Sequence, residues 1–314
     1  MRTILFFLFL SFITTGGNKK DKQPAPVENT PQAKLGEGSI WHPEKKAQMW
    51  VDITEGRVFM YKPAEGMIHN IELESMVGTV VPAKGEFFAI AAQETGITGI
   101  REDGSTEILA DFPPDAEENV RFNDGKCDPE GRLWIGTMHK QARQGAGKLY
   151  MLEDDSLHIK EPRVTISNGI VWDTDINVMY YIDTPEQCIY AYDYEPETGN
   201  ISNRRVVVEI PEENGSPDGM AIDSKGKLWV GHWGGHGVYR WDPKNGELLQ
   251  KIEVPAPNVT SCAFGGKDLK TLYITTAREG LSEDQLAEYP LSGSLFVKDV
   301  EIKGTKAFMF KQQQ

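Results

Sequence analysis

The segments DPEGRLWIG at residues 128–136 and DSKGKLWVG at residues 223–231 decide the fold of this chain. Each begins with residues typical of a tight turn and continues into a short apolar strand with a central aromatic residue. Similar strands recur along the chain, and their aromatic residues are Trp50, Phe88, Trp134, Tyr181, Trp229 and Tyr273. Successive aromatic residues lie 38, 46, 47, 48 and 44 positions apart. Because a four-stranded blade occupies about 40–50 residues, this period predicts an all-β, six-bladed β-propeller.

Other all-β folds fit this period less well. A lipocalin-like barrel would need a shorter chain with evenly spaced strands, and a β-sandwich would not need such a long repeat. Helical periodicity is nearly absent, although residues 279–288 could form one or two helical turns.

The composition excludes some classes of partner. The chain has 314 residues, of which 39% are hydrophobic, and a formal net charge of −14. The hydrophobic content is enough for a folded core, and the negative charge would repel a phosphate backbone, so nucleic acid is not an expected partner. An acidic surface is otherwise common, so it identifies no partner and leaves the oligomeric state open.

The N-terminal residues 1–17 have the order of a secretory signal peptide: a basic residue, an apolar run from Ile4 to Ile13, and then small residues. The apolar run is too short to span a bilayer, so we expect no transmembrane span in the mature chain. Residues 18–34 are rich in polar residues and proline, which predicts a flexible linker before a propeller domain at 35–314. The chain is therefore expected to be exported, to the periplasm or outside the cell.

Three cysteines, Cys127, Cys188 and Cys262, lie in or beside apolar stretches without CxxC spacing. Their odd number and wide separation give no disulfide framework. We expect buried, unpaired thiols.

Four polar clusters occur at the same stage of the repeat, just before or at the start of a blade. They are GEG at 36–38, RFNDG at 121–125, SNG at 167–169 and PDG at 217–219. Any one of them could simply form a turn, because Asn-Gly and Asp-Gly are common turn dipeptides. Four in phase with the blades favour a shared site at the mouth of the central channel, where innermost strands converge.

Three of these clusters offer Glu37, Asn168 and Asp218, which would supply only oxygen ligands, two of them anionic. Such ligands suit a hard cation such as calcium, magnesium or manganese, whereas zinc usually prefers nitrogen or sulfur. Three protein ligands would leave open positions for water and substrate. The sequence therefore predicts a central metal site.

The same segments resemble the SMP-30/gluconolactonase family, and the resemblance extends from about residue 35 to the end of the chain. It implies a six-bladed propeller with one divalent metal, calcium favoured and zinc, manganese, magnesium or iron possible, held by Glu37, Asn168 and Asp218. It also implies that Asp218 is catalytic and helps to activate water. The implied substrate is a sugar lactone held by Arg121 and Asn123.

Asp124 and Gln141 complete the expected substrate-binding set, each with a reservation. Asp124 could instead form a structural ion pair with Arg121. Gln141 stands where similar members of the family carry an acidic residue, and its amide can bind a hydroxyl but lacks the charge of a carboxylate. A nearby loop also contains His232 and His236, for which hydrogen bonding or packing is expected rather than metal binding.

These observations predict a metal-dependent hydrolase that opens sugar lactones such as gluconolactone. Two alternatives stay open. A propeller can bind calcium without turnover, because a fold does not determine function. The same residues could also hydrolyse esters or phosphotriesters.

Overall fold

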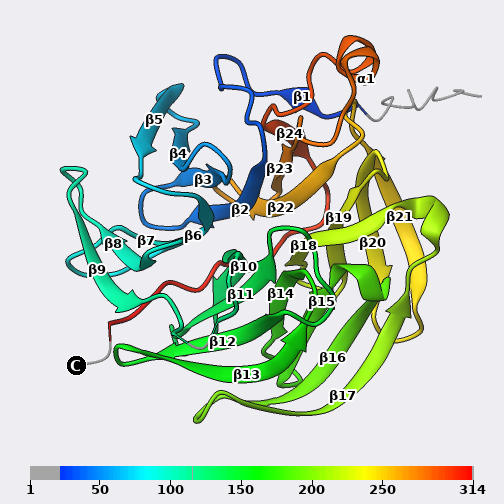
Figure 1. Cartoon of the computed structure of the whole chain (residues 1–314). Coiled ribbons are helices and arrows are strands. Elements are labelled where there is room, and N and C mark those ends of the chain that lie inside the picture. The colour runs from blue at the N-terminus through cyan, green and yellow to red at the C-terminus, as the bar shows by residue number, and fades with distance from the viewer. Residues whose placement is uncertain (1–21, 115, 313–314) are drawn as a thin grey trace, which may run out of the picture.

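The computed structural model describes residues 22–114 and 116–312, and these residues form six four-stranded sheets arranged as blades around a central axis (Figure 1). The first two blades are β2 (Gly36–His42), β3 (Ala47–Asp52), β4 (Arg57–Lys62), β5 (Met67–Glu72), and β6 (Val77–Pro82), β7 (Ala89–Gln93), β8 (Gly96–Ile100), β9 (Thr106–Asp111). The third and fourth are β10 (Val120–Cys127), β11 (Leu133–His139), β12 (Gly147–Glu153), β13 (Ser156–Val164), and β14 (Ser167–Asp173), β15 (Val178–Asp183), β16 (Cys188–Glu195), β17 (Asn200–Glu209). The fifth is β18 (Ser216–Ile222), β19 (Leu228–Trp233), β20 (Gly237–Asp242) and β21 (Glu247–Glu253). The six-bladed propeller expected from the aromatic repeat is confirmed.

The sixth blade joins the two ends of the domain. Its strands are β22 (Val259–Gly265), β23 (Thr271–Thr276), β24 (Phe296–Asp299) and, outermost, β1 (Ala25–Pro26). Because β1 pairs with β24, the segment before residue 35 is not a flexible linker throughout. Its buried Val27 and Ala33 belong to the propeller, a correction to the expected boundary. The predicted signal peptide at 1–17 lies outside the described residues.

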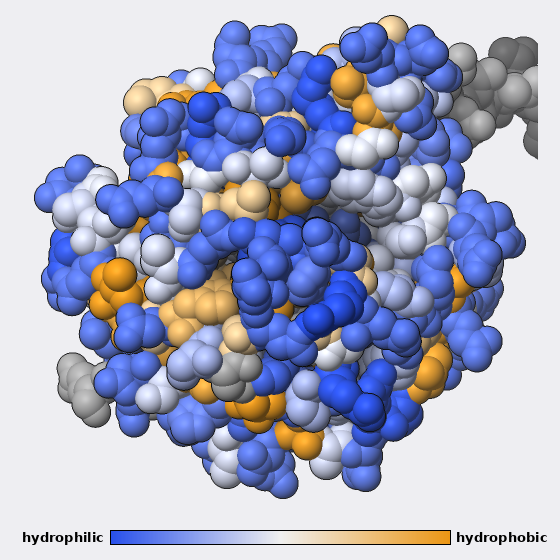
Figure 2. Space-filling view, in the orientation of Figure 1, coloured by the Kyte–Doolittle hydropathy of each residue, from blue (hydrophilic) through white to orange (hydrophobic). Residues whose placement is uncertain are grey.

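The core lies between the blades. The innermost strands β2, β6 and β22 are buried along their whole length, whereas outer strands such as β5 and β21 are largely exposed. Trp50, Trp134 and Trp229 lie on the second strand of their blades and are at most 1% exposed. Figure 2 shows the resulting surface, on which hydrophilic residues predominate and hydrophobic ones form separate patches.

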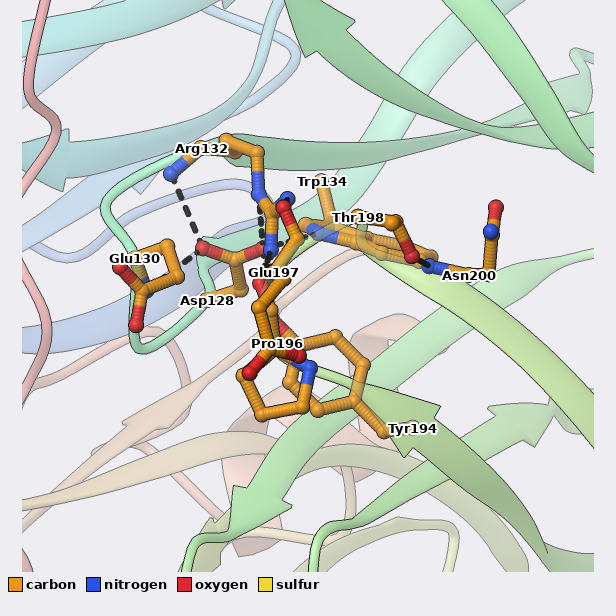
Figure 3. A network of polar contacts seen from close by, with 9 residues as sticks. All are labelled: Asp128, Glu130, Arg132, Trp134, Tyr194, Pro196, Glu197, Thr198 and Asn200. Carbon is orange, nitrogen blue, oxygen red and sulfur yellow. Dashed lines mark hydrogen bonds and ion pairs between the residues drawn. The ribbon is translucent and has the colours of Figure 1, made fainter.

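A buried aspartate explains why the segment 128–136 is so informative (Figure 3). The Asp128 carboxylate Oδ2 accepts hydrogen bonds from Arg132 Nε at 2.7 Å, Trp134 Nε1 at 3.0 Å and the Tyr194 hydroxyl at 2.9 Å. Its Oδ1 accepts the backbone N–H groups of Glu130 and Arg132, each at 3.0 Å. The aspartate therefore fixes the turn before β11 and orients the blade's tryptophan.

The matching segment 223–231 repeats this arrangement in the fifth blade. Asp223 Oδ2 accepts from Trp229 Nε1 at 2.9 Å and Arg240 Nε at 2.8 Å. Its Oδ1 accepts the backbone N–H groups of Lys225 at 2.8 Å and Lys227 at 3.0 Å. The similarity of the two sequences thus reflects a shared hydrogen-bond network.

Helical structure is confined to short segments. The helix α1 (Glu283–Glu288) begins with a capping box between Ser282 and Gln285 and falls within the expected residues 279–288. The 3₁₀ turns η1 (Thr184–Glu186) and η2 (Glu212–Asn214) connect strands. Within the described part of the chain, no helix is long and apolar enough to cross a membrane. The three cysteines are buried and unpaired, as expected.

The C-terminal segment crosses one face of the propeller, seen in red in Figure 1 as it passes β10 toward the C-terminus. Thr305 N donates to Ile222 O at 3.2 Å, Phe310 N to Pro82 O at 2.8 Å, and Lys311 N to Gly131 O at 2.9 Å. Ile222 and Pro82 end the innermost strands β18 and β6. The segment therefore covers the channel at the ends of the innermost strands, and we call this face the underside.

Candidate metal and substrate site

The four polar clusters meet at the opposite mouth of the channel, where innermost strands begin. Glu37 lies on β2, Asn123 and Asp124 on β10, Asn168 on β14 and Asp218 on β18. All five side chains are at most 6% exposed. The structure thus brings together residues that are far apart in the sequence.

Each cluster forms an irregularity within a strand rather than a turn between strands. The pairing register shifts between Glu37 and Ile40, Phe122 and Gly125, Ser167 and Ile170, and Pro217 and Met220. Such β-bulges redirect side chains and are common beside functional sites. Here they explain the recurring pairing of a polar residue with glycine, which could also have indicated turns.

Glycine is needed in these bulges because neighbouring innermost strands approach closely. A Cβ atom on Gly169 would lie 2.6 Å from Asp218 O, and one on Gly219 would lie 2.3 Å from Ser261 Oγ. Real Cβ atoms do not come this close to any other heavy atom, so a larger residue would push the strands apart. The spacing of the site's side chains therefore depends on these glycines.

Asn123 is held in place by three hydrogen bonds. Its Oδ1 accepts from Arg121 Nη1 at 2.7 Å, and its Nδ2 donates to Ser167 O at 2.8 Å and, more weakly, to Asn168 Oδ1 at 3.5 Å. Arg121 Nη1 also donates to Phe122 O at 2.9 Å. These bonds engage one edge of the guanidinium and direct Arg121 toward the pocket.

The three buried carboxylates are destabilised as anions. Burial, together with nearby Asp124, raises the pKa of Glu37 to about 8. Burial and the neighbouring charge of Glu37 raise the pKa of Asp218 well above its usual range, and burial also raises the pKa of Asp124. The described residues leave Asp218 Oδ1 and Asp124 Oδ2 buried without hydrogen-bond partners.

These features fit a divalent cation. A bound cation would compensate the crowded negative charge and satisfy the unpartnered Asp218 Oδ1. Asn168 on β14 would add a neutral oxygen ligand, and Glu37 on β2 would add an anionic one. Over the described residues, no group of three or more His, Cys, Asp and Glu side chains has ligating geometry. The metal itself stays a proposal.

The rim of the pocket contains carboxylates that the sequence did not reveal. Glu94, in the loop after β7, pairs with Lys140, and Glu279, after β23, accepts from Thr54 Oγ1 at 2.9 Å. Burial lowers the pKa of Arg121, and the negative charges of Glu94 and Glu279 act in the opposite direction. They come from different blades, and nothing in their local sequence distinguishes them from surface acids.

Gln141, expected to bind substrate, has an exposed side chain for which the structure shows no hydrogen bond among the described residues. Its side chain is exposed in the turn after β11, and its backbone N–H donates to His139 Nδ1 at 3.1 Å. The alternative role of Asp124, an ion pair with Arg121, is not the arrangement in the structure: its Oδ1 accepts the Gly125 N–H at 2.8 Å, and its charge is opposed chiefly by Lys126. Substrate binding by Asp124 and Gln141 stays a prediction.

His232 has a structural role. Its Nδ1 lies 2.9 Å from Asn214 O, its Nε2 accepts from Trp241 Nε1 at 3.4 Å, and its ring stacks on Tyr239 with centroids 4.0 Å apart. Both ring nitrogens are therefore occupied, and burial lowers the histidine's pKa to about 4. His236 contacts the ring of Tyr289 at 5.3 Å. Packing and hydrogen bonding thus account for both histidines.

The fold and the site define a class: a six-bladed propeller with a cluster of buried carboxylate and amide side chains at one mouth of its channel. The family model described as "SMP-30/Gluconolactonase/LRE-like region" matches residues 35–278, and the chain belongs to this family. The family resemblance inferred from the sequence is confirmed.

Several relatives match along nearly their whole length. The chain is 40% identical over 288 residues to "Putative sugar lactone lactonase YvrE" of Bacillus subtilis (strain 168), covering 91% of this chain and 98% of that protein. It is 36% identical to regucalcin of Xenopus laevis, covering 86% and 93%.

Two solved structures are also similar to this chain. A luciferin-regenerating enzyme has a TM-score of 0.84 at 31% identity, covering 92% of this chain and 99% of that one. A calcium-binding protein, regucalcin, from Agrobacterium tumefaciens str. C58 has a TM-score of 0.87 at 27% identity, covering 93% and 98%.

Proposed function

We propose that this protein is a metal-dependent hydrolase that opens sugar lactones such as gluconolactone. The observation that carries the proposal is the buried Asp218 carboxylate, whose Oδ1 has no partner among the described residues and lies in a pocket that also contains Arg121. The name of the YvrE relative supports a lactone as the substrate class. Calcium is the favoured cation, supported by the name of the Agrobacterium relative.

Glu37, Asn168 and Asp218 would hold the cation. When bound, a divalent cation supplies Lewis acidity toward a carbonyl and lowers the pKa of water. Asp218 would accept the proton of the attacking water on its carboxylate, because it lies in the same buried cluster as the other two expected ligands.

Arg121 and Asn123 would position the substrate. Phe122 O and Asn123 Oδ1 engage Arg121 Nη1, so the remaining guanidinium N–H groups can donate to the hydroxyl and carbonyl oxygens of a sugar lactone. Because Arg121 and Asn123 are at most 9% exposed, water would be largely excluded around the bound ring.

A calcium-binding propeller without turnover is the second candidate, supported by the name of the Agrobacterium relative, a calcium-binding protein. Hydrolysis of aryl esters or phosphotriesters at the same residues is the third. Export, predicted from residues 1–17, is part of our proposal and would place the protein away from cytosolic calcium buffering.

One panel of assays separates these candidates. Aldonolactones with five- and six-membered rings, an aryl ester and a phosphotriester are each incubated with metal-free protein and with calcium, zinc, manganese, magnesium or ferrous iron. We expect lactone opening above the spontaneous rate only with metal, and loss of that rate on chelation. Calcium binding without hydrolysis of any compound would establish the second candidate, whereas faster turnover of the ester or phosphotriester would establish the third.

A further inference from the structure

The underside of the propeller contains a groove far from the carboxylate pocket. It has a volume of about 470 Å³ and lies between the loops of the first and sixth blades and the C-terminal segment. Trp41, Pro43, Pro63 and Leu269 provide an apolar lining. Trp41 is 6% exposed and is held by stacking on Tyr273, with ring centroids 5.7 Å apart. The apolar wall is thus fixed by the blade core.

Four lysines surround this apolar lining: Lys46, Lys267, Lys303 and Lys306. All four are exposed, and Asp268 is the one acidic residue that lines the groove with them. Across the described part of the chain, none of these lysines forms an ion pair. This concentration of positive charge contrasts with a chain whose formal net charge is −14.

The groove adjoins a second cavity at the lower end of the central channel. A smaller cavity of about 70 Å³ shares Trp41, Lys306 and Ala307 with it. The smaller cavity is lined mainly by apolar residues of the innermost strands, including Val171 and Phe264. A ligand with a charged head and an apolar body could therefore place its head among the lysines and its body toward the channel.

Exposed lysines are usually no more than solvated surface, and three features set these apart. They border a concave surface, the surface is largely apolar, and among the described residues Asp268 is the one carboxylate that lines it with the four lysines. The volume also falls in the range of about 300–1,000 Å³ typical of small-molecule sites. Held together without an anion, such like charges repel one another.

We propose that the underside groove binds a small amphipathic anion, a molecule with one carboxylate or sulfonate group on an apolar body. The lysines bind the anionic group, and Trp41 and Leu269 contact the apolar part. This site is separate from the proposed hydrolase site, because it lies at the other end of the channel and uses none of the same residues.

The fluorescent sulfonate anilinonaphthalene sulfonate (ANS) tests the proposal by titration of the full, metal-loaded chain, with decanoate as a competitor. We expect one bound ANS per chain, displaced by decanoate, with an affinity that falls as salt rises. In the double variant Lys267→Ala/Lys306→Ala, two charge-assisted contacts are lost, which should weaken binding about tenfold. Near-UV circular dichroism verifies that each variant retains its native packing.

The matched control is Lys225→Ala/Lys244→Ala, which removes the same charge from exposed turns outside the groove. It should bind ANS as the unchanged protein does. Equal weakening in both double variants would mean that only the overall charge matters, and several weak ANS sites per chain, or binding insensitive to Lys267 and Lys306, would overturn the proposal.

Discussion

The side-chain amide of Asn168 donates a 2.8 Å hydrogen bond to the hydroxyl of Thr184. The same hydroxyl donates to Pro217 O at 2.9 Å, directly before Asp218. Thr184 thus fixes which way the Asn168 amide points and connects it to the neighbouring blade. Because the Asn168 Nδ2 group is engaged, its Oδ1 is the atom available to a cation.

Replacement of this hydroxyl should weaken metal binding without unfolding the blade. In Thr184→Val the shape is kept but both hydrogen bonds are lost, so the Asn168 amide can rotate. Loss of such a supporting partner typically reduces metal affinity about 10- to 100-fold. Calorimetric titration with calcium measures the effect, and Thr184→Ser should retain most of the affinity. Equal affinities for the valine and serine variants would contradict this role.

Thr184 also illustrates what the sequence could predict about the site. Glu37, Asn123, Asn168 and Asp218 were identifiable because each recurs at one stage of a repeat that the sequence displays. Thr184 follows the second strand of a single blade, and no equivalent residue occurs at the same stage of the other blades. Its role depends on the distance between two strands, which only the folded structure supplies.

Asp218→Asn should separate activity from stability. The amide cannot accept the proton of the attacking water, so kcat should fall by about 10²- to 10⁴-fold in the lactone assay. The variant also removes a carboxyl group whose ionised form is disfavoured by burial and by Glu37, so the metal-free protein should be at least as stable toward urea as the unchanged protein. Full activity in this variant would exclude Asp218 as the base.

Arg121→Lys tests whether the shape of the guanidinium matters as well as its charge. Lysine keeps the positive charge near Glu37, but its N–H donors all radiate from one nitrogen. It therefore lacks the planar fork with which Arg121 bonds Asn123 Oδ1 and Phe122 O through one nitrogen and keeps other N–H groups for a substrate. We expect KM for the lactone to rise about tenfold or more, equivalent to about 1.4 kcal/mol, with a smaller effect on calcium affinity. A lysine variant with unchanged KM would place Arg121 outside the substrate contacts.

The N-terminal segment shows a different limit of sequence reasoning. Residues 18–34 have the polar, proline-containing composition of a linker, yet Ala25–Pro26 pair with β24 and close the sixth blade. A two-residue outer strand buries too few side chains to leave an apolar pattern. Its position is determined by the unpaired edge of β24, a feature that lies about 270 residues further along the chain.

His232 should contribute to acid sensitivity. Its pKa is about 4 in the folded protein, against about 6.5 for an ordinary histidine, so only the unfolded chain takes up a proton as the pH falls between these values. The contribution of His232 to the free energy of unfolding is therefore fully present above pH 6.5. It decreases by about 3 kcal/mol as the pH falls to 4. Urea unfolding of His232→Gln should show a shallower pH dependence, while the exposed control His158→Gln should follow the unchanged protein. Identical profiles for all three proteins would refute this.

The aspartate network before β11 should be a major determinant of stability. Asp128→Asn keeps the volume of the side chain but replaces one acceptor oxygen with a donor, which would face Arg132, Trp134 and Tyr194 or the turn N–H groups. Because breaking a buried charge pair typically costs about 3–5 kcal/mol, urea unfolding should show a loss of this order.

Asp223→Asn in the fifth blade should have a similar effect, since Asp223 also accepts from a turn, a tryptophan and an arginine. The exposed Asp175→Asn serves as the control and should change stability by less than about 0.5 kcal/mol. Tyr194→Phe removes one neutral donor from the Asp128 network, so its cost should be nearer about 1 kcal/mol. Equal losses of unfolding free energy in Asp128→Asn and Asp175→Asn would contradict this role. The hydrogen bond from tryptophan to aspartate that both segments share would then not explain why they specify a blade.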